Sequence, residues 1–274
     1  NLERYEEAAE TYRRSIAIHE AVLGSDALEL ALPLNNLGLA INSLGRHEEA
    51  EVAYRRALAI EEAVLGPDAV GLFVPLSNLA LLLHEVGRFQ ESGELFSRSL
   101  EIYEAALDPD DLELAGLLLR LGTNLTSSGR IPEAEEVFRR GVAIHEAALA
   151  PYGLELADLR SSLGVALRDL GNFGEAEALL ESNLTELEAL LGPDDPRVVE
   201  NLNYLGLLYV TTARYEEAED IFGQALSIAD AGYNMWATLN NLALIYLRQD
   251  HLQEAESFFL RAIEMIEGGQ AANP

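Results

Sequence analysis

The sequence predicts an all-α solenoid, a row of stacked helix pairs, and three observations predict it. A motif recurs every 42 residues, apolar residues inside each unit follow three- and four-residue spacing, and Gly or Pro marks the unit boundaries. The recurring dipeptides are Gly45-Arg46, Gly87-Arg88, Gly129-Arg130, Gly171-Asn172 and Ala213-Arg214. Repeats of about 20–50 residues are typical of arrays in which each unit buries its apolar face only by stacking on its neighbours.

Each unit has the pattern of two helices. In the first, residues 28–44, one helical face carries Leu30, Leu34, Leu37, Ile41 and Leu44. Gly45 is expected to end this helix. The second, residues 46–65, has a glutamate-rich first turn that suits the positive end of the helix dipole. The Gly66-Pro67-Asp68 segment then breaks the chain before the next unit.

Extending this pattern along the chain predicts thirteen helices in one array over residues 1–267. A leading helix over 1–23 precedes six helix pairs, and a flexible tail is expected over 268–274. The pairs are expected over 26–65, 68–107, 110–149, 152–191, 194–230 and 233–267. Stacked in this way, the pairs are expected to form a right-handed superhelix. Neither end carries an obvious polar cap, so we expect a longer polypeptide or a second chain that covers an end.

Certain rows of residues must be small or bulky in every unit. Small residues, where two helices would cross closely, are Gly38, Ala80, Gly122, Gly164, Gly206 and Ala243. Bulky residues, which would fill the space between units, are Tyr54, Phe96, Phe138, Leu180, Phe222 and Phe259. We interpret both rows as core rather than as a cofactor-stacking site.

Composition and charge exclude several functions. The 274 residues contain no cysteine, and all 18 basic residues are arginine, which excludes disulfides, Schiff-base lysines and a P-loop lysine. The formal net charge of −29 would repel phosphates and anionic lipid, so neither nucleic acid nor a membrane is expected as a partner. The absence of a signal peptide favours the cytoplasm. The lysine-free composition is typical of a GC-rich, bacterial coding sequence.

No motif indicates catalysis, a cofactor or a metal. The five histidines lack the spacing of metal ligands, and two of them, His19 and His145, occupy equivalent positions three units apart. The aspartates of the linkers, such as Asp111 and Asp195, are expected to cap helices. No nucleophile elbow is present. The chain is therefore predicted not to be an enzyme, with no catalytic residue, no cofactor and no metal.

The repeated residues resemble a tetratricopeptide repeat. The resemblance is carried by Asn36-Leu37-Gly38, Gly45-Arg46, Glu48-Glu49-Ala50, Tyr54 and Arg56-Ala57-Leu58. The 42-residue step, the Asn-Asn-Leu-Gly-Leu-Ala string and the Leu-Gly-Pro-Asp linker resemble the kinesin-light-chain subtype. Two departures concern the third and fourth units, where Asn183 stands in the place of Ala57, and Leu119-Arg120 replaces Asn35-Asn36.

In such arrays the first helices line the concave surface, and geometry selects the residues that are free there. Positions 32, 35, 36, 39, 42 and 43, with their equivalents in other units, lie opposite the apolar face. Seven of the 14 asparagines fall at these positions, and the set is nearly neutral. The binding candidates are Asn35, Asn36, Leu39, Asn42, Asn78, Leu81, Arg120, Arg168, Asn203, Tyr204, Leu207, Asn240, Asn241, Leu244 and Arg248.

These candidates suit an extended peptide, because Asn offers both a donor and an acceptor to a main chain while Leu can receive side chains. The resemblance implies that Asn36, Asn78 and Asn241 grip the peptide backbone. The alternative is that these asparagines only recur as part of the repeat pattern of the family, and that their amides are solvated. Arg120, Arg168 and Arg248 are expected either to meet acidic side chains or a C-terminal carboxylate of a partner, or to pair with Glu or Asp on a neighbouring helix.

The resulting hypothesis is an interaction scaffold that binds a protein or an extended peptide in its groove. The alternative is a regulatory region of a larger enzyme, such as a caspase-like protease or a nucleotide-binding sensor, with the groove filled by the same polypeptide. That alternative rests on analogy with arrays of this kind. A structural spacer without a ligand is the third interpretation.

Overall fold

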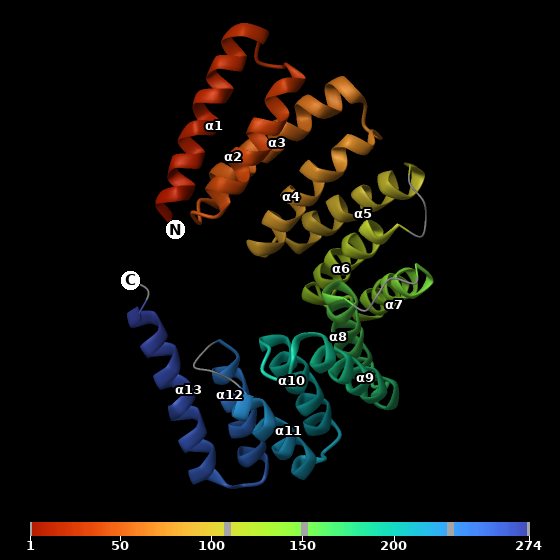
Figure 1. The fold of residues 1–274 in the computed structure, drawn as a ribbon, viewed down its shortest axis with the longest axis vertical. Helices are drawn as coiled ribbons and strands as arrows, with labels where there is room; N and C mark the ends of the chain where they lie inside the picture. The colour runs from red at the N-terminus through yellow and green to blue at the C-terminus, as the bar shows by residue number, and fades with distance from the viewer. Residues whose placement is uncertain (1, 107–110, 149–152, 229–232, 273–274) are drawn as a thin grey trace. The chain divides into compact units, whose positions relative to one another are not determined.

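A computed structural model describes residues 2–106, 111–148, 153–228 and 233–272. These residues form thirteen α-helices and two short 3-10 helices without a β-strand, which confirms the predicted fold class (Figure 1). The α-helices are α1 (Leu2–Leu23), α2 (Ala31–Asn42), α3 (His47–Leu65), α4 (Phe73–Glu85), α5 (Phe89–Ala106), α6 (Leu112–Ser127), α7 (Ile131–Ala147), α8 (Leu154–Asp169), α9 (Phe173–Leu191), α10 (Pro196–Thr211), α11 (Tyr215–Ile228), α12 (Tyr233–Arg248) and α13 (Leu252–Ala272).

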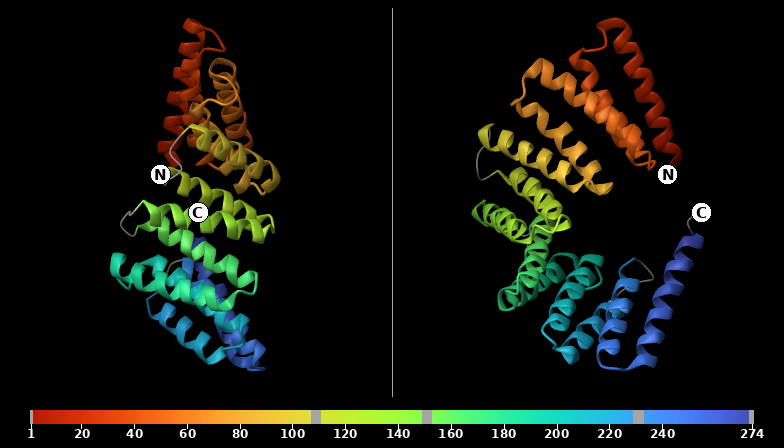
Figure 2. Two further views of the ribbon diagram at one scale, coloured as in Figure 1. Left: turned by 90° about the vertical axis from the view of Figure 1, so that its right-hand side faces the viewer. Right: turned by 180° about the vertical axis from the view of Figure 1, so that it is seen from behind.

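The chain divides into two compact units, residues 1–148 and residues 149–274. In the first unit α1 packs on α2, and the pairs α2–α3, α4–α5 and α6–α7 each form a helical hairpin. In the second unit the hairpins are α8–α9, α10–α11 and α12–α13. Within each unit the second helix of one hairpin packs on the first helix of the next, as in α3–α4 and α9–α10, so hairpins stack in chain order (Figure 2).

Most helices begin and end close to the Gly and Asp residues predicted to bound them, with small differences. Gly45 adopts φ of +73°, and Arg46 N–H then donates to the Ile41 carbonyl at 3.2 Å, which closes the last turn of α2. Asp111 and Asp195 cap α6 and α10, since each side chain accepts from the backbone two residues later at 2.9 Å. The first turn predicted for α2 is instead the 3-10 helix Leu28–Leu30.

The C-terminal boundary also differs from the expectation. The sequence pattern predicts that the last helix ends near Glu267, whereas α13 continues to Ala272. The two glycines of this segment, Gly268 and Gly269, favoured an earlier end because glycine is a weak helix former.

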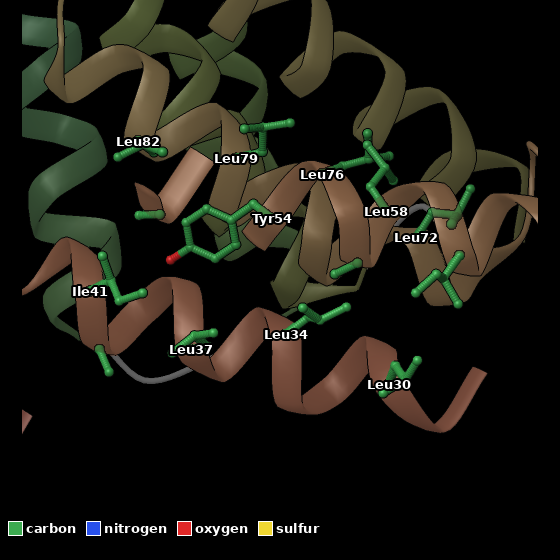
Figure 3. Close-up of a cluster of buried hydrophobic side chains, with 14 of the residues drawn as sticks. Leu30, Leu34, Leu37, Ile41, Tyr54, Leu58, Leu72, Leu76, Leu79 and Leu82 are labelled. Atoms are coloured by element: carbon green, nitrogen blue, oxygen red, sulfur yellow. The ribbon is translucent and has the colours of Figure 1, made fainter. Parts of the chain in front are cut away.

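Five of the six residues of the bulky row are buried, in agreement with their interpretation as core. Tyr54, Phe96, Phe138, Leu180 and Phe222 are each at most 1% exposed. Tyr54 lies among leucines of α2 and α4 (Figure 3). A Cβ atom added to Gly38 would lie 2.6 Å from Cε1 of Tyr54, so this crossing requires glycine. Phe259, the last member of the row, is only half-buried.

Candidate peptide-binding surface

The first unit exposes aliphatic side chains on two neighbouring first helices. Leu32 and Leu39 of α2 are 68% and 46% exposed, and Val74 and Leu81 of α4 are 52% and 39% exposed. Each pair is seven residues apart, which places its members on one helical face, and the 42-residue step makes the two pairs equivalent. We call these four residues the exposed strip. Most other apolar residues of α2 and α4 are buried.

Two asparagines lie within the strip, midway between its members along each helix. Asn36 and Asn78 are half-buried. The Asn78 Nδ2 donates to Asn35 Oδ1 at 3.0 Å, which leaves its own Oδ1 as an acceptor. Among the described residues Asn36 has no side-chain hydrogen bond. The strip therefore combines exposed aliphatic side chains with half-buried side-chain amides, which carry both hydrogen-bond donors and acceptors.

Two residues of the strip, Leu32 and Val74, are not among the binding candidates predicted from the sequence. Leu32 and Val74 occupy a position that the helical geometry selects, yet only Leu39 and Leu81 were singled out. The sequence does indicate them, because position 32 lies seven residues before position 39 and therefore on the same helical face. The structure extends the predicted apolar row by these two residues.

Asn35 and Asn203 are wrongly predicted as groove residues. They are only 6% and 8% exposed, because their position on the helix faces the neighbouring first helix. Asn203 Nδ2 donates to the Val199 carbonyl and to Thr238 Oγ1, both at 2.9 Å. Asn241 Nδ2 in turn lies 3.4 Å from Asn203 Oδ1. These amides form hydrogen bonds between consecutive first helices instead of remaining free for a peptide.

Asn42 and Arg168 are also engaged within the chain. Asn42 Nδ2 donates to Glu85 at 2.9 Å, and its Oδ1 lies 2.8 Å from Nδ1 of His47, so this side chain ties α2 to α3 and α4. Arg168 pairs with its neighbour Asp169 at 2.7 Å. Arg168 thus forms an intramolecular ion pair, but with the adjacent residue of its own helix and not with a neighbouring helix as the alternative expected.

Arg120 and Arg248 differ from Arg168. Both are exposed, and within the described part of the chain neither side chain forms an ion pair or a hydrogen bond. The other arginines of the first unit between Arg13 and Arg140 all pair with glutamates. Arg88, for example, bridges Glu51 of the preceding hairpin and Glu91 of its own. α6 is the first helix of the third hairpin, and on it Arg120 stands at the position that Asn36 holds on α2 and Asn78 holds on α4.

The first helices of the second unit present a different surface. Asp158 of α8 and Glu200 of α10 stand where the first unit has Leu32 and Val74. Tyr204 donates to Glu200 at 2.6 Å, and burial raises the pKa of its hydroxyl. Burial also raises the pKa of the Asp158 carboxyl, with Glu200 adding to the effect.

The remaining candidates of the second unit are partly exposed. Leu207 is half-buried and Leu244 is 38% exposed, while Asn240 and Asn241 are half-buried. No continuous aliphatic strip is formed by the described first helices of this unit, because the equivalents of Leu32 are acidic or alanine. The predicted residues of this unit therefore do not form the same kind of surface.

The departure at Asn183 has a structural reason. Asn183 is fully buried, and its Nδ2 donates to the Ala157 carbonyl at 3.1 Å and to Ser161 Oγ at 2.9 Å. Asn201 Nδ2 also donates to Ser161, at 3.2 Å. These residues form a buried polar network between α8, α9 and α10 in place of the small apolar contact at Ala57.

The described ranges contain neither a candidate metal site nor a candidate membrane-spanning helix. No set of three histidine, aspartate or glutamate side chains within them could hold one metal ion. No described helix is both long enough and apolar enough to cross a lipid bilayer.

Comparison with known proteins agrees with the fold. The chain is similar to BtubC (BKLC) from P. vanneervenii, with 22% identity, 83% of this chain and 94% of that chain covered, and a TM-score of 0.67. A putative kinesin light chain from Podospora anserina with nearly identical TPR-like repeats gives 20% identity, 74% and 96% coverage and a TM-score of 0.66. None of the curated proteins matches the sequence.

A third similar structure contains a repeat region within a larger protein. It is a signal transduction ATPase with numerous domains that has a tetratricopeptide repeat sensor, from Pyrococcus horikoshii. Its identity to this chain is 15%, its TM-score is 0.70, and the match covers 89% of this chain and 38% of that one.

Family profiles match nearly the whole length. Tetratricopeptide repeat profiles match residues 1–63, 29–91, 71–147 and 155–231, and a second profile of the same description matches residues 237–267. This repeat is in general a scaffold for protein interactions and is typically not catalytic. The chain belongs to the tetratricopeptide repeat family.

Proposed function

We propose that this chain recruits a protein partner by binding an extended segment of it across α2 and α4 of the first unit. One observation carries the proposal. Leu32, Leu39, Val74 and Leu81 are exposed on helices whose other apolar residues are largely buried. We further propose that this binding takes place in the cytoplasm, and that the partner is neither nucleic acid nor membrane.

The chemistry of the strip supports an extended peptide over a folded surface. Asn36 can pair with main-chain groups, which are unpaired along an extended segment, and so can the Oδ1 of Asn78, which has no partner within the described ranges. The aliphatic side chains on either side of each amide can cover apolar side chains of the same segment. Because the helices that carry these groups are held by a buried core, the surface is formed before binding, which reduces the entropy lost on association.

A peptide selection tests the proposal. A phage library of random nine-residue peptides is selected on the whole chain, and enriched peptides are labelled with fluorescein for anisotropy titrations. The Leu39→Ser, Leu81→Ser double variant should bind at least about tenfold more weakly, because it loses apolar contact worth about 1.4 kcal/mol or more. Val52→Ser is the matched control, since Val52 is 68% exposed on α3, a second helix that carries no strip residue.

Two outcomes would count against the proposal. A library that yields no binding peptide would mean that the strip does not recognise extended segments. Peptides that bind the double variant and wild type equally would place the binding surface elsewhere. Circular dichroism of each variant shows whether a loss of binding comes from unfolding, which is not expected at exposed positions.

A sensor role in a larger enzyme is the second candidate. The similarity to the signal transduction ATPase with a tetratricopeptide repeat sensor favours it. In that case a segment of the same polypeptide, or a signal protein, would occupy the strip. Determining the residues encoded before and after this sequence tests it, and the absence of an enzyme domain from the complete polypeptide would contradict it.

A further inference from the structure

Three side chains of the second unit form a polar network where α8, α9 and α10 meet. Asn183 of α9 and Asn201 of α10 are completely buried, and Ser161 of α8 is half-buried. The Nδ2 atoms of the two asparagines donate to the Ser161 Oγ, at 2.9 Å and 3.2 Å. Because α8 and α9 form one hairpin and α10 begins the next, the Asn201 hydrogen bond links two consecutive hairpins.

The repeat does not require polar residues at these places. Other hairpins of the chain carry the same two positions as part of the apolar core. At the equivalents of Asn183 and Asn201 stand buried apolar residues, which are Ala57, Ala225, Leu117 and Leu159. The second unit therefore has a polar contact between hairpins where apolar packing is available to the same fold.

Stability alone does not account for this polar contact. The Oδ1 atom of Asn201 is buried and has no hydrogen-bond partner among the described residues. An acceptor in this state has lost its hydration without a replacement, and apolar side chains of similar shape are often as stable or more stable in such places. Buried polar groups can instead select one packing partner, because a wrong neighbour leaves them unpaired.

Selection among neighbours matters in this chain because its hairpins are built on one 42-residue pattern. Wrong assembly and exchange of elements between copies are characteristic failures of repeat proteins. A stack of α10 on a hairpin like α6–α7, for example, would place Asn201 against the equivalents of Ser161 and Asn183. These equivalents are Leu119 and Gly141, whose side chains offer no hydrogen bond. The buried amide of α10 would then have no partner.

We propose that the network of Ser161, Asn183 and Asn201 selects the α10–α11 hairpin as the neighbour of the α8–α9 hairpin, and so opposes the exchange of hairpins with a second copy of the chain. The Ser161 hydroxyl is the centre of this device, because both amides donate to it. Its role concerns assembly of the second unit and is independent of the partner proposed for the first unit.

The test replaces the network with apolar residues. The triple variant Ser161→Ala, Asn183→Ala, Asn201→Leu is unfolded in urea together with a ¹⁵N-labelled copy of itself and refolded, and native mass spectrometry measures the mixed dimers. The triple variant should give a larger mixed-dimer fraction than wild type treated in the same way. Ser77→Ala, Ser99→Ala is the matched control, because this equivalent pair lies within one hairpin, with its Oγ atoms 3.5 Å apart, and should leave the fraction unchanged.

Urea unfolding of the same proteins separates selection from stability. Ser161→Ala alone should lower the urea midpoint, because both buried amides lose their acceptor. The triple variant should have a midpoint equal to or above that of wild type, since no member of the network is left unpaired. A second triple variant with Asn183→Leu retains the branching of the Asn side chain, which covers the case in which Ala leaves a cavity.

Two results would overturn the proposal. Triple variants that refold with no more mixed dimer than wild type would show that the network does not select the neighbouring hairpin. Midpoints below that of wild type in both triple variants would show that the network contributes net stability, which would then explain its presence.

Discussion

At the scale of single residues, the fold depends on contacts that leave no room for a methyl group. Gly38, Gly122 and Gly206 each lie under the ring of a buried aromatic residue of the following helix. The same pairing of a small and a bulky residue recurs with Gly164 and Leu180. Because protein interiors are close-packed, an added atom must displace the ring or the helix.

A glycine substitution tests this contact. Gly38→Ala should lower the free energy of unfolding by about 1–3 kcal/mol, since its Cβ would lie 2.6 Å from Tyr54. Gly223→Ala is the control, because this helical glycine has no atom within 4 Å of an added Cβ, and it should gain about 0.5–1 kcal/mol. Urea unfolding followed by circular dichroism measures both, and equal effects at the two sites would contradict the packing argument.

A half-buried carboxyl group makes stability depend on pH. Burial raises the pKa of Glu61, and its Oε2 has no hydrogen-bond partner among the described residues. The folded state therefore binds this proton more tightly than the unfolded state, and the stability that protonation contributes is lost as pH rises above 4.5 through the folded pKa. Glu61→Gln should be more stable than wild type at pH 7, and the difference should shrink as pH falls through the folded pKa towards 4.5.

The neighbouring Glu62 provides the control for that prediction. Glu62 pairs with Arg98 of the next hairpin, so Glu62→Gln should leave stability unchanged or lower it at pH 7. Thermal unfolding of the three proteins between pH 4 and pH 8 makes the comparison. A Glu61→Gln variant that is less stable than wild type at pH 7 would show that the carboxylate is favourably placed.

At the scale of helices, asparagines connect the first helices within each unit. Asn35 accepts from Asn78, and Asn203 contacts both Thr238 and Asn241. The helix positions and the core rows could be predicted from the sequence, because apolar spacing and the repeat step determine them. The role of Asn35 and Asn203 could not be predicted from the sequence. A single helical wheel separates a buried from an exposed face, and it does not show where the neighbouring first helix lies.

Substitution distinguishes connecting asparagines from those available for binding. Asn203→Ala should lower the free energy of unfolding by about 1–3 kcal/mol, because Thr238 and Asn241 are left without this partner in a buried place. Asn36→Ala should change it by less than about 0.5 kcal/mol, since Asn36 has no described side-chain partner. Urea titration measures both values. Equal losses would mean that Asn36 is also structural.

At the scale of the whole molecule, the two units carry different surfaces on their first helices. The first unit has the aliphatic strip and the unpaired Arg120, whereas the second unit has Asp158, Glu200 and Tyr204 at the corresponding places. The net charge of −29 comes largely from glutamates on the second helices and in their first turns. The sequence predicted a nearly neutral set of groove positions, and the structure shows that this average combines an apolar face with an acidic one.

The central claim is that the exposed strip contacts the partner, and photo-cross-linking tests it most directly. A photoreactive amino acid at Leu32 or at Val52, both 68% exposed, is irradiated in cells that express the chain, and adducts are identified by mass spectrometry. We predict a discrete protein adduct from position 32, lost when Leu39 and Leu81 are replaced by Ser, and none from position 52. Adducts from position 52 alone, or adducts from position 32 that persist in the double variant, would contradict the account.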